Sequence, residues 1–262
     1  LVALGGYGRK EFFPFSDIDL MILYRPAIKK QINVIADAIL YPLWDTGLEV
    51  GHGVRTVSES IKHAKEEYFF LVALLDARLV CGSSALFDEL VATYRKKFVD
   101  GHRESFVKKM KEHRQSRRER FGSHSYLLEP HIKEGRGGMR DIQAMMWTAR
   151  VVFGLNSLDD IHAAGLLVES EVQDFLEGRA MINRLRSQLH LLGGRKSDQL
   201  YFEHQADLAE LFGYKSEDGI LGVERFMRDV YGALRTVSII TDLFFDHVDE
   251  VLGLAGKRQV VG

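Results

Sequence analysis

The sequence has little cysteine and little proline, with one cysteine, Cys81, and four prolines among 262 residues. A single cysteine excludes an intramolecular disulfide framework and a multi-cysteine zinc site, so we expect a reducing compartment, the cytoplasm. No stretch reaches the roughly eighteen consecutive apolar residues of a membrane span, and the amino terminus has no secretory signal pattern. We therefore expect neither export nor a membrane partner.

The sequence also has no marked excess of positive or negative charge. It contains 35 Lys and Arg residues and 37 Asp and Glu residues, which give a formal net charge of −2. Near-neutrality removes the case for general electrostatic attraction to nucleic acid or anionic lipid. What is present is a globular composition, with 46% hydrophobic and 27% charged residues. The length predicts one large domain or two ordinary ones. Because the chain starts inside an apparent strand and without methionine, we expect it to be a fragment.

Two kinds of pattern divide the chain near residue 83. Before it, short apolar runs at 1–4, 17–24, 48–55 and 78–81 predict strands, and the stretches 29–44 and 56–75 between them predict helices. This alternation is typical of an α/β layer. From 84 onward the pattern is almost wholly helical, with helices predicted at 106–121, 139–153, 170–193, 203–213 and 222–248.

Two carboxylates, Asp17 and Asp19, lie on the second predicted strand. Side chains two residues apart in a strand point to the same face, so the pair would share one site, with Ile18 and Leu20 buried behind it. Like charges at that spacing repel unless a cation neutralises them, and hard oxygen ligands suit Mg²⁺, whose open positions are usually filled by phosphates and water. The alternative is a pair of ordinary surface carboxylates.

A glycine turn, Gly5 and Gly6, precedes this strand and follows the first one. Glycine allows a sharp turn and close approach of a phosphate to backbone amides at a helix start. Arg9 and Lys10 would add charge-assisted contacts to that phosphate. Each feature alone is weak, but the combination of turn, helix and paired carboxylates predicts a site for metal-assisted phosphoryl chemistry.

The segment GGYGRKEFFPFSDIDLMIL at 5–23 resembles the nucleotidyltransferase signature in the form found in bacterial PII uridylyltransferases. Further segments resemble the same family in the same order, namely LEVGHGVRT at 48–56, LLDARLVCG at 74–82 and LEPHIKEGRGGMRDIQ at 128–143. The resemblance implies a nucleotidyltransferase-like mixed sheet with helices, the catalytic domain, at 1–83. It implies the family's all-α helical domain at 84–262. Lys10 departs from the glycine or arginine common at its position.

By the same resemblance, the chain would transfer UMP from UTP to a tyrosine of the PII nitrogen-regulatory protein and release pyrophosphate, with Mg²⁺ as cofactor. The HD-type hydrolase and ACT domains of longer members leave no trace in this sequence, so we expect no uridylyl removal or glutamine sensing. One alternative is an adenylyltransferase relative acting on glutamine synthetase or another acceptor. Another is a catalytically inactive domain that binds nucleotide or a partner.

The resemblance also implies a third carboxylate. Glu49 is the favoured candidate, at the start of the third strand, and Asp76 is the alternative, whose bland role would be an ion pair with Arg78. Arg55 shares a strand face with Glu49 and could meet a phosphate there.

A second glycine turn, 135–138, carries Arg136 and is followed by Arg140. Either arginine could contact nucleotide phosphates, or the glycines could meet steric needs while Arg140 and Asp141 pair locally. The basic helix at 106–121 is most simply a solvated face.

Overall fold

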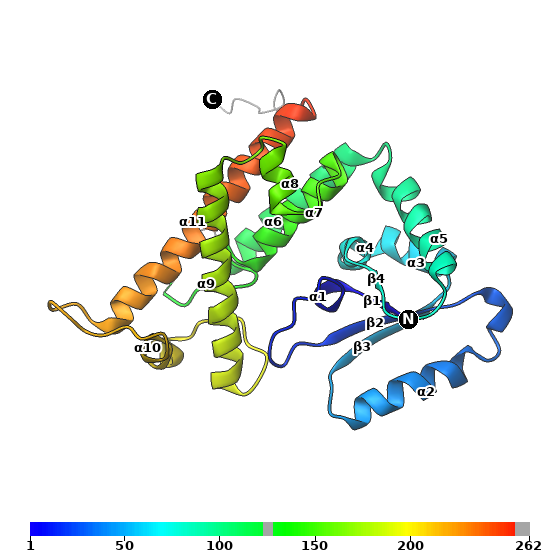
Figure 1. Cartoon of the computed structure of the whole chain (residues 1–262), viewed down its shortest axis with the longest axis horizontal. Coiled ribbons are helices and arrows are strands. Elements are labelled where there is room, and N and C mark those ends of the chain that lie inside the picture. The colour runs from blue at the N-terminus through cyan, green and yellow to red at the C-terminus, as the bar shows by residue number, and fades with distance from the viewer. Residues whose placement is uncertain (123–127, 255–262) are drawn as a thin grey trace. The chain divides into compact units, whose positions relative to one another are not determined.

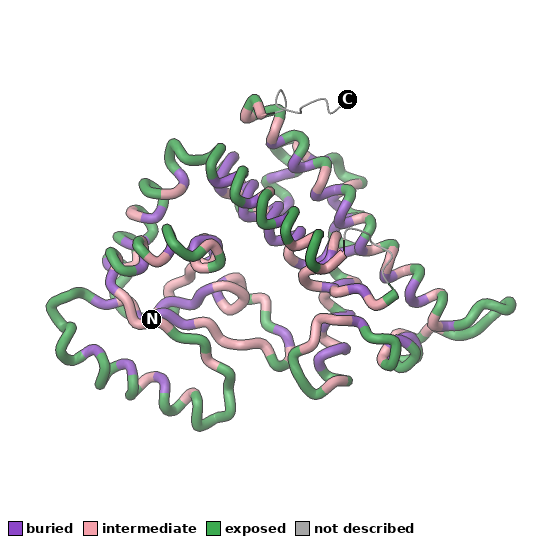
Figure 2. The backbone as a smooth tube through the Cα atoms, turned by 180° about the vertical axis from the view of Figure 1, so that it is seen from behind, coloured by how far each residue is buried: buried purple, intermediate pink, exposed green. Residues whose placement is uncertain are grey.

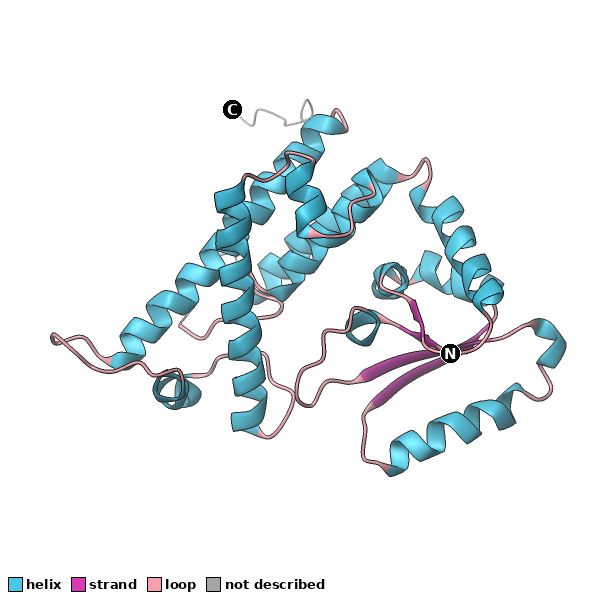
Figure 3. Ribbon diagram, in the orientation of Figure 1, coloured by secondary structure: helices cyan, strands magenta, loops and turns pink. Residues whose placement is uncertain are grey.

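The computed structural model of the chain describes residues 1–122 and 128–254. The chain divides into two compact units, residues 1–102 and 103–262, and each is described by itself below. Residues 255–262, which the expected helical domain includes, lie outside the described residues. The first unit is an α/β region and the second is helical, which confirms the predicted fold class (Figures 1 and 3).

A small mixed sheet organises the first unit (Figure 3). Its strands are β1 (Val2–Ala3), β2 (Ile18–Leu23), β3 (Val50–Arg55) and β4 (Arg78–Leu79), in the order β3-β2-β1-β4. β1 is antiparallel to both β2 and β4, whereas β2 and β3 run parallel. The register of the parallel pair sets Asp19 beside Gly51 and Leu23 beside Arg55. The glycine-rich β3 therefore lies directly alongside the strand that carries the two carboxylates.

Helices surround this sheet: α1 (Gly5–Gly8), α2 (Ile32–Asp45), α3 (Val57–Glu66), α4 (Tyr68–Leu75), α5 (Ser84–Tyr94), a 3₁₀ turn (Pro26–Ile28) and a π-helical turn (Arg95–Val99). α2 covers one face, where Ile22 packs with Ile32 and Leu40. α3 meets the other face, where the hydroxyl of Ser60 contacts the sulfur of Met21. Alternation along β2 therefore directs Ile22 to one side and Asp19 and Met21 to the other.

The helix predicted at 56–75 is two helices. The predicted capping box is confirmed, because the amide of Glu59 donates to the Thr56 hydroxyl at 3.2 Å and the amide of Thr56 donates to the Glu59 carboxylate at 2.8 Å. The break falls at Glu67, whose extended backbone (φ −114°, ψ 109°) turns the chain between α3 and α4. A break of one extended residue leaves no glycine or proline signal, so the sequence pattern could not reveal it.

The second unit consists of α6 (Arg103–Phe121), α7 (Met139–Phe153), α8 (Leu158–Ala163), α9 (Glu169–Gly193), α10 (Phe202–Leu211) and α11 (Gly222–Val251). Five of these match predicted helices, and α8 was missed. The long helices α9 and α11 pack together, and Phe175, Phe226 and Phe244 are fully buried. Figure 2 shows buried stretches recurring along the helices. Across 1–122 and 128–254, no helix combines the length and apolar character needed to cross a membrane.

The division between the compact units lies after His102, later than the change of pattern at residue 83. α5 belongs to the first unit because it packs on α3, and the Tyr94 hydroxyl donates to the carbonyl of Leu71 in α4 at 2.9 Å. A change from strands to helices does not require a change of compact unit. The catalytic boundary at 83 and the extent of the helical domain stay predictions.

Candidate functional site

The two carboxylates predicted to share a face lie at the start of β2. Asp17 immediately precedes the strand and Asp19 is its second residue, and both are half-buried. Leu20 points to the opposite face and is only 5% exposed. Alternation along the strand therefore directs Asp19 to the side of the sheet away from α2, and the same alternation, continued one residue before the strand, assigns Asp17 to that side too.

Glycines from two separate segments make room for Asp19. A Cβ added to Gly5 would lie 3.2 Å from Asp19 Oδ2, and one added to Gly51 would lie 2.6 Å from Asp19 Oδ1. Gly5 has φ +52°, a conformation that glycine adopts without steric cost. The carboxylate thus lies between the turn after β1 and the backbone of β3, and a larger side chain at Gly51 would displace it.

The turn at Gly5–Gly8 is held in place by close packing and by Arg78. A Cβ on Gly8 would lie 2.1 Å from the carbonyl oxygen of Asp76, so only glycine fits there. The Arg78 guanidinium donates to the carbonyls of Gly8 at 3.2 Å and Tyr7 at 3.0 Å, and it lies 5.3 Å from the centre of the Tyr7 ring. Arg78 therefore stabilises the turn that contacts Asp19.

Asp76 pairs with Arg9, not with Arg78 as the bland interpretation expected. Arg9 Nη1 donates to Asp76 Oδ2 at 2.5 Å and Arg9 Nε donates to Glu11 Oε2 at 2.7 Å. Burial would lower the pKa of Arg9, but the two carboxylates outweigh it and raise the pKa. The Asp76 side chain is 1% exposed. Arg9 therefore stabilises the turn through its ion pairs with Asp76 and Glu11. Its contact with a nucleotide phosphate stays a prediction.

Lys10 is exposed and has φ +61°, a left-handed conformation that costs a non-glycine residue about 1–2 kcal/mol. Replacing Lys10 by glycine removes this cost but adds backbone entropy to the unfolded chain. We expect Lys10→Gly to raise the free energy of unfolding by about 0.5–1 kcal/mol, measured by urea denaturation. Lys62→Gly, at an exposed site inside α3, should instead lower it by about 1 kcal/mol. A loss of stability in Lys10→Gly would contradict the strain at this residue.

Glu49 and Arg55 lie at the two ends of β3. Glu49 is exposed, immediately precedes the strand, and its carbonyl accepts from the amide of Ile18 at 2.8 Å. The register extended by one residue sets Glu49 beside Asp17. Arg55 folds back over Gly53, and its guanidinium carbon lies 5.0 Å from the centre of the Phe70 ring.

Metal binding by Asp17 and Asp19 stays a prediction. Within residues 1–122 and 128–254, no group of three or more His, Cys, Asp or Glu side chains is placed to hold a metal ion. The choice of Glu49 or Asp76 as a third carboxylate therefore stays open. The paired oxygens of Asp17 and Asp19 suit a hard divalent cation, because two carboxylates leave coordination positions for phosphates and water.

Arg136 and Arg140 lie in the second unit, and both donate hydrogen bonds to side-chain oxygens. Arg136 Nε donates to Ser238 Oγ at 2.8 Å, and its Nη2 donates to Asp242 Oδ2 at 3.1 Å. Arg140 donates to Glu134 at 3.3 Å and to Gln143 at 2.8 Å.

The glycines of the second turn are needed for packing, because a Cβ on Gly137 would lie 1.8 Å from the carbonyl of Leu234 in α11. These contacts support the local, structural interpretation of the turn. Phosphate binding by Arg136 or Arg140 stays a prediction.

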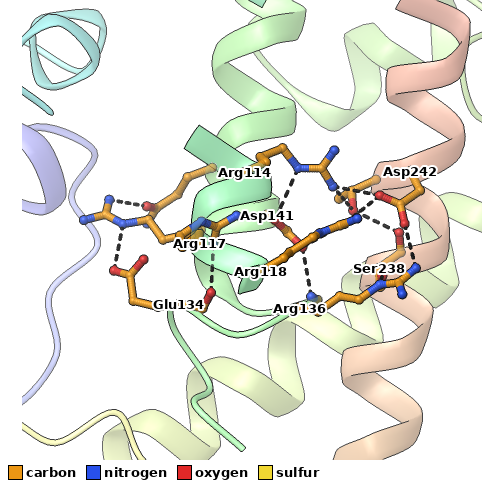
Figure 4. A network of polar contacts seen from close by, with 12 residues as sticks. Arg114, Arg117, Arg118, Glu134, Arg136, Asp141, Ser238 and Asp242 are labelled. Carbon is orange, nitrogen blue, oxygen red and sulfur yellow. Dashed lines mark hydrogen bonds and ion pairs between the residues drawn. The ribbon is translucent and has the colours of Figure 1, made fainter. Parts of the chain in front are cut away.

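A buried carboxylate, Asp141, connects this turn to α6 and α11 (Figure 4). Its side chain is fully buried. It accepts a hydrogen bond from the backbone amide of Gly137 at 2.9 Å. It also accepts hydrogen bonds from the guanidinium groups of Arg114 at 3.3 Å, Arg118 at 3.5 Å and Arg117. Arg114 and Arg118 continue to Asp242 of α11, at 2.9 and 2.6 Å. The network therefore joins three helices through one carboxylate pair.

The charges in this network shift the pKa values of both carboxylates. Burial raises the pKa of Asp141, but the arginines around it and the Gly137 amide outweigh burial and lower the pKa well below its ordinary value. The pKa of Asp242 is lowered in the same way, against burial, by Arg118 and Arg114. Both groups are therefore ionised near neutral pH and compensate the arginines.

The network also corrects the prediction of a solvated basic helix. Arg114 is 7% exposed, and the side chains of Arg117 and Arg118 are 13% and 18% exposed. They point into the unit, whereas Lys108 and Lys109 are exposed. The pattern of arginines three and four residues apart was the available signal, because that spacing gives one helix face.

The fold and the carboxylate strand together define a class of protein. A glycine turn after one strand, two carboxylates at the start of the next and a following helical part are consistent with a nucleotidyltransferase-like fold. A family model described as GlnD PII-uridylyltransferase matches residues 105–245, more than half of the chain. The chain belongs to this family.

Curated relatives agree with this assignment. The chain is 37% identical over 252 residues to the bifunctional uridylyltransferase/uridylyl-removing enzyme of Pseudomonas aeruginosa (strain LESB58), and 36% identical to the proteins of that name from Pseudomonas putida (strain GB-1) and Pseudomonas entomophila (strain L48). Each match covers 96% of this chain and 28% of the relative. The chain thus spans a little over a quarter of the length of these relatives.

Proposed function

We propose that this chain transfers UMP from UTP to a tyrosine hydroxyl of a PII signal protein and releases pyrophosphate. The observation that carries the proposal is the pair Asp17 and Asp19 at the start of β2, with the Asp19 carboxylate against Gly5 and Gly51. Carboxylates of this kind can hold a divalent cation beside a turn that admits phosphates.

The reaction is a displacement at phosphorus. The tyrosine oxygen attacks the α-phosphorus of UTP, a new P–O bond forms, the bond between the α- and β-phosphates breaks, and pyrophosphate leaves. Asp17 and Asp19 would hold Mg²⁺, which when bound offsets negative charge on the phosphates. Gly5 and Gly6 leave space for the triphosphate, and Glu49 or Asp76 would accept the proton of the attacking hydroxyl. Lys10 and Arg55 would contact phosphate oxygens.

The identity of the nucleotide and acceptor rests on the relatives. Their name, uridylyltransferase/uridylyl-removing enzyme, and the description of the family model support UTP as donor and a PII protein as acceptor. The single exposed cysteine, Cys81, is in keeping with action in a reducing cytoplasm.

Labelled nucleotides test the donor and the acceptor together. The chain is incubated with Mg²⁺ and either α-labelled UTP or α-labelled ATP, in the presence of a purified PII protein or glutamine synthetase. We expect label from UTP on a tyrosine of the PII protein, and none on glutamine synthetase. Transfer from ATP alone would favour the adenylyltransferase alternative, and binding of UTP without transfer would favour an inactive regulatory domain.

A further inference from the structure

The tight turn that leads into the carboxylate strand contains a residue in an unfavourable conformation. Residues 13–16 form a β-turn in which the Ser16 amide donates to the carbonyl of Phe13 at 3.0 Å, with Pro14 at its second position. The third position, Phe15, has φ +58°. A turn with proline second and positive φ third is of type II, which favours glycine or asparagine at that third position. A bulky phenylalanine there is an outlier.

The phenylalanine ring does not compensate this cost by burial, because Phe15 is 51% exposed. Phe12 in the same segment is 52% exposed, and its ring contacts Tyr7 edge-on with 5.9 Å between centroids. Phe13, between them, is 7% exposed and anchors the turn. The segment therefore presents two apolar rings to solvent while its centre is fixed to the core. Strained residues of this kind persist at functional sites, where the side chain has a use that the fold alone does not explain.

The position of the turn indicates what it would contact. Phe15 precedes Asp17 by two residues, so the turn leads directly into the strand that carries Asp19. Two substrates must approach there, the nucleotide and the protein that bears the acceptor hydroxyl. Small molecules are bound in concave sites that bury most of their surface, whereas aromatic side chains, phenylalanine among them, are enriched in protein interfaces. The exposure of Phe12 and Phe15 therefore favours contact with the protein substrate over contact with the nucleotide.

We propose that Phe15 and Phe12 form a docking surface for the acceptor protein, which would present an apolar patch beside its acceptor hydroxyl. The inference rests on the proposed nucleotidyl transfer and extends it by naming the residues that select the acceptor. The strain at Phe15 is retained because the ring binds the acceptor and places it beside Asp17 and Asp19.

Two substitutions separate binding from conformational strain. Phe15→Ala and Phe15→Gly remove the same ring, but only glycine relieves the positive φ. We expect the urea midpoint of Phe15→Gly to lie above that of Phe15→Ala and at or above that of the unsubstituted chain. Tyr41→Ala is the matched control, because Tyr41 is 57% exposed on α2, which covers the opposite face of the sheet.

The kinetic measurement is UMP transfer from UTP to a purified PII protein, with each substrate varied in turn. We expect both Phe15 variants to raise the KM for the PII protein about tenfold and to leave the KM for UTP unchanged. Tyr41→Ala should change neither. An unchanged KM for the PII protein in both variants would overturn the inference, and so would a rise confined to the KM for UTP, which would indicate contact with the base. If the unsubstituted chain transfers nothing, both the proposed function and this inference fail, whereas normal transfer by the variants defeats the inference alone.

Discussion

Replacement of Asp17 or Asp19 by asparagine should lower the rate of UMP transfer by at least about a thousandfold, a loss of about 4 kcal/mol of transition-state stabilisation. Asparagine keeps the shape of the side chain but removes the charge that would hold a divalent cation. Asp19 lies against Gly5 and Gly51, so the isosteric change should not disturb the backbone. The measurement is kcat with saturating UTP, Mg²⁺ and PII protein.

Asp37→Asn is the matched control, since Asp37 is exposed on α2, across the sheet from Asp19. It should leave kcat unchanged. Thermal unfolding of all three variants should coincide with that of the unsubstituted chain. Transfer within threefold of normal in Asp19→Asn would show that the carboxylate pair is not the metal site.

Asp141→Asn should lower the free energy of unfolding of the second unit by about 3–5 kcal/mol, because removal of one partner from a buried ion pair leaves the other uncompensated. Here three arginines lose a fully buried carboxylate, while Asp242 continues to pair with two of them, Arg114 and Arg118. Urea denaturation measures the loss. Asp159→Asn, at an exposed site in α8, should change the stability by less than about 0.5 kcal/mol. An equal effect of the two substitutions would show that the network contributes nothing.

The same carboxylate predicts how stability depends on pH. The pKa of Asp141 is lower in the folded chain than in the unfolded one, so its contribution is complete above the unfolded value of about 3.9. The contribution is lost as pH falls through the lower, folded pKa. Asp198 behaves in the same direction, because Arg186 and His190 outweigh its burial. We therefore expect a smaller loss of stability on acidification below pH 4 in Asp141→Asn than in the unsubstituted chain.

Local patterns predicted much of this molecule, because they act over a few residues. The capping box of Thr56 and Glu59 needs only three residues of separation, and the common face of Asp17 and Asp19 follows from the period of a strand. The bounds of α7, Met139–Phe153, follow from the glycine before it and the left-handed glycine, Gly154, after it. Each of these features is determined by residues that are close together in the sequence.

Contacts between distant residues could not be predicted in the same way. Arg9 and Asp76 are 67 positions apart, and the nearer Arg78 was the plausible partner until the sheet order placed the turn beside β4. Arg118 and Asp242 are 124 positions apart. Pairing of this kind depends on which helix faces meet, which a single sequence does not contain. The strain at Phe15 is local, but it could not be predicted either, because a phenylalanine after proline does not indicate a positive φ.

A crystal structure of the chain with Mg²⁺ and a non-hydrolysable UTP analogue would show where metal and nucleotide bind. We expect a metal ion bound by the carboxylates of Asp17 and Asp19 and in contact with the triphosphate, with the phosphates beside Gly5 and Gly6. The same structure would decide between Glu49 and Asp76 as the third carboxylate. A nucleotide bound elsewhere in the chain, with no metal at Asp17 and Asp19, would show that these carboxylates do not form the transfer site.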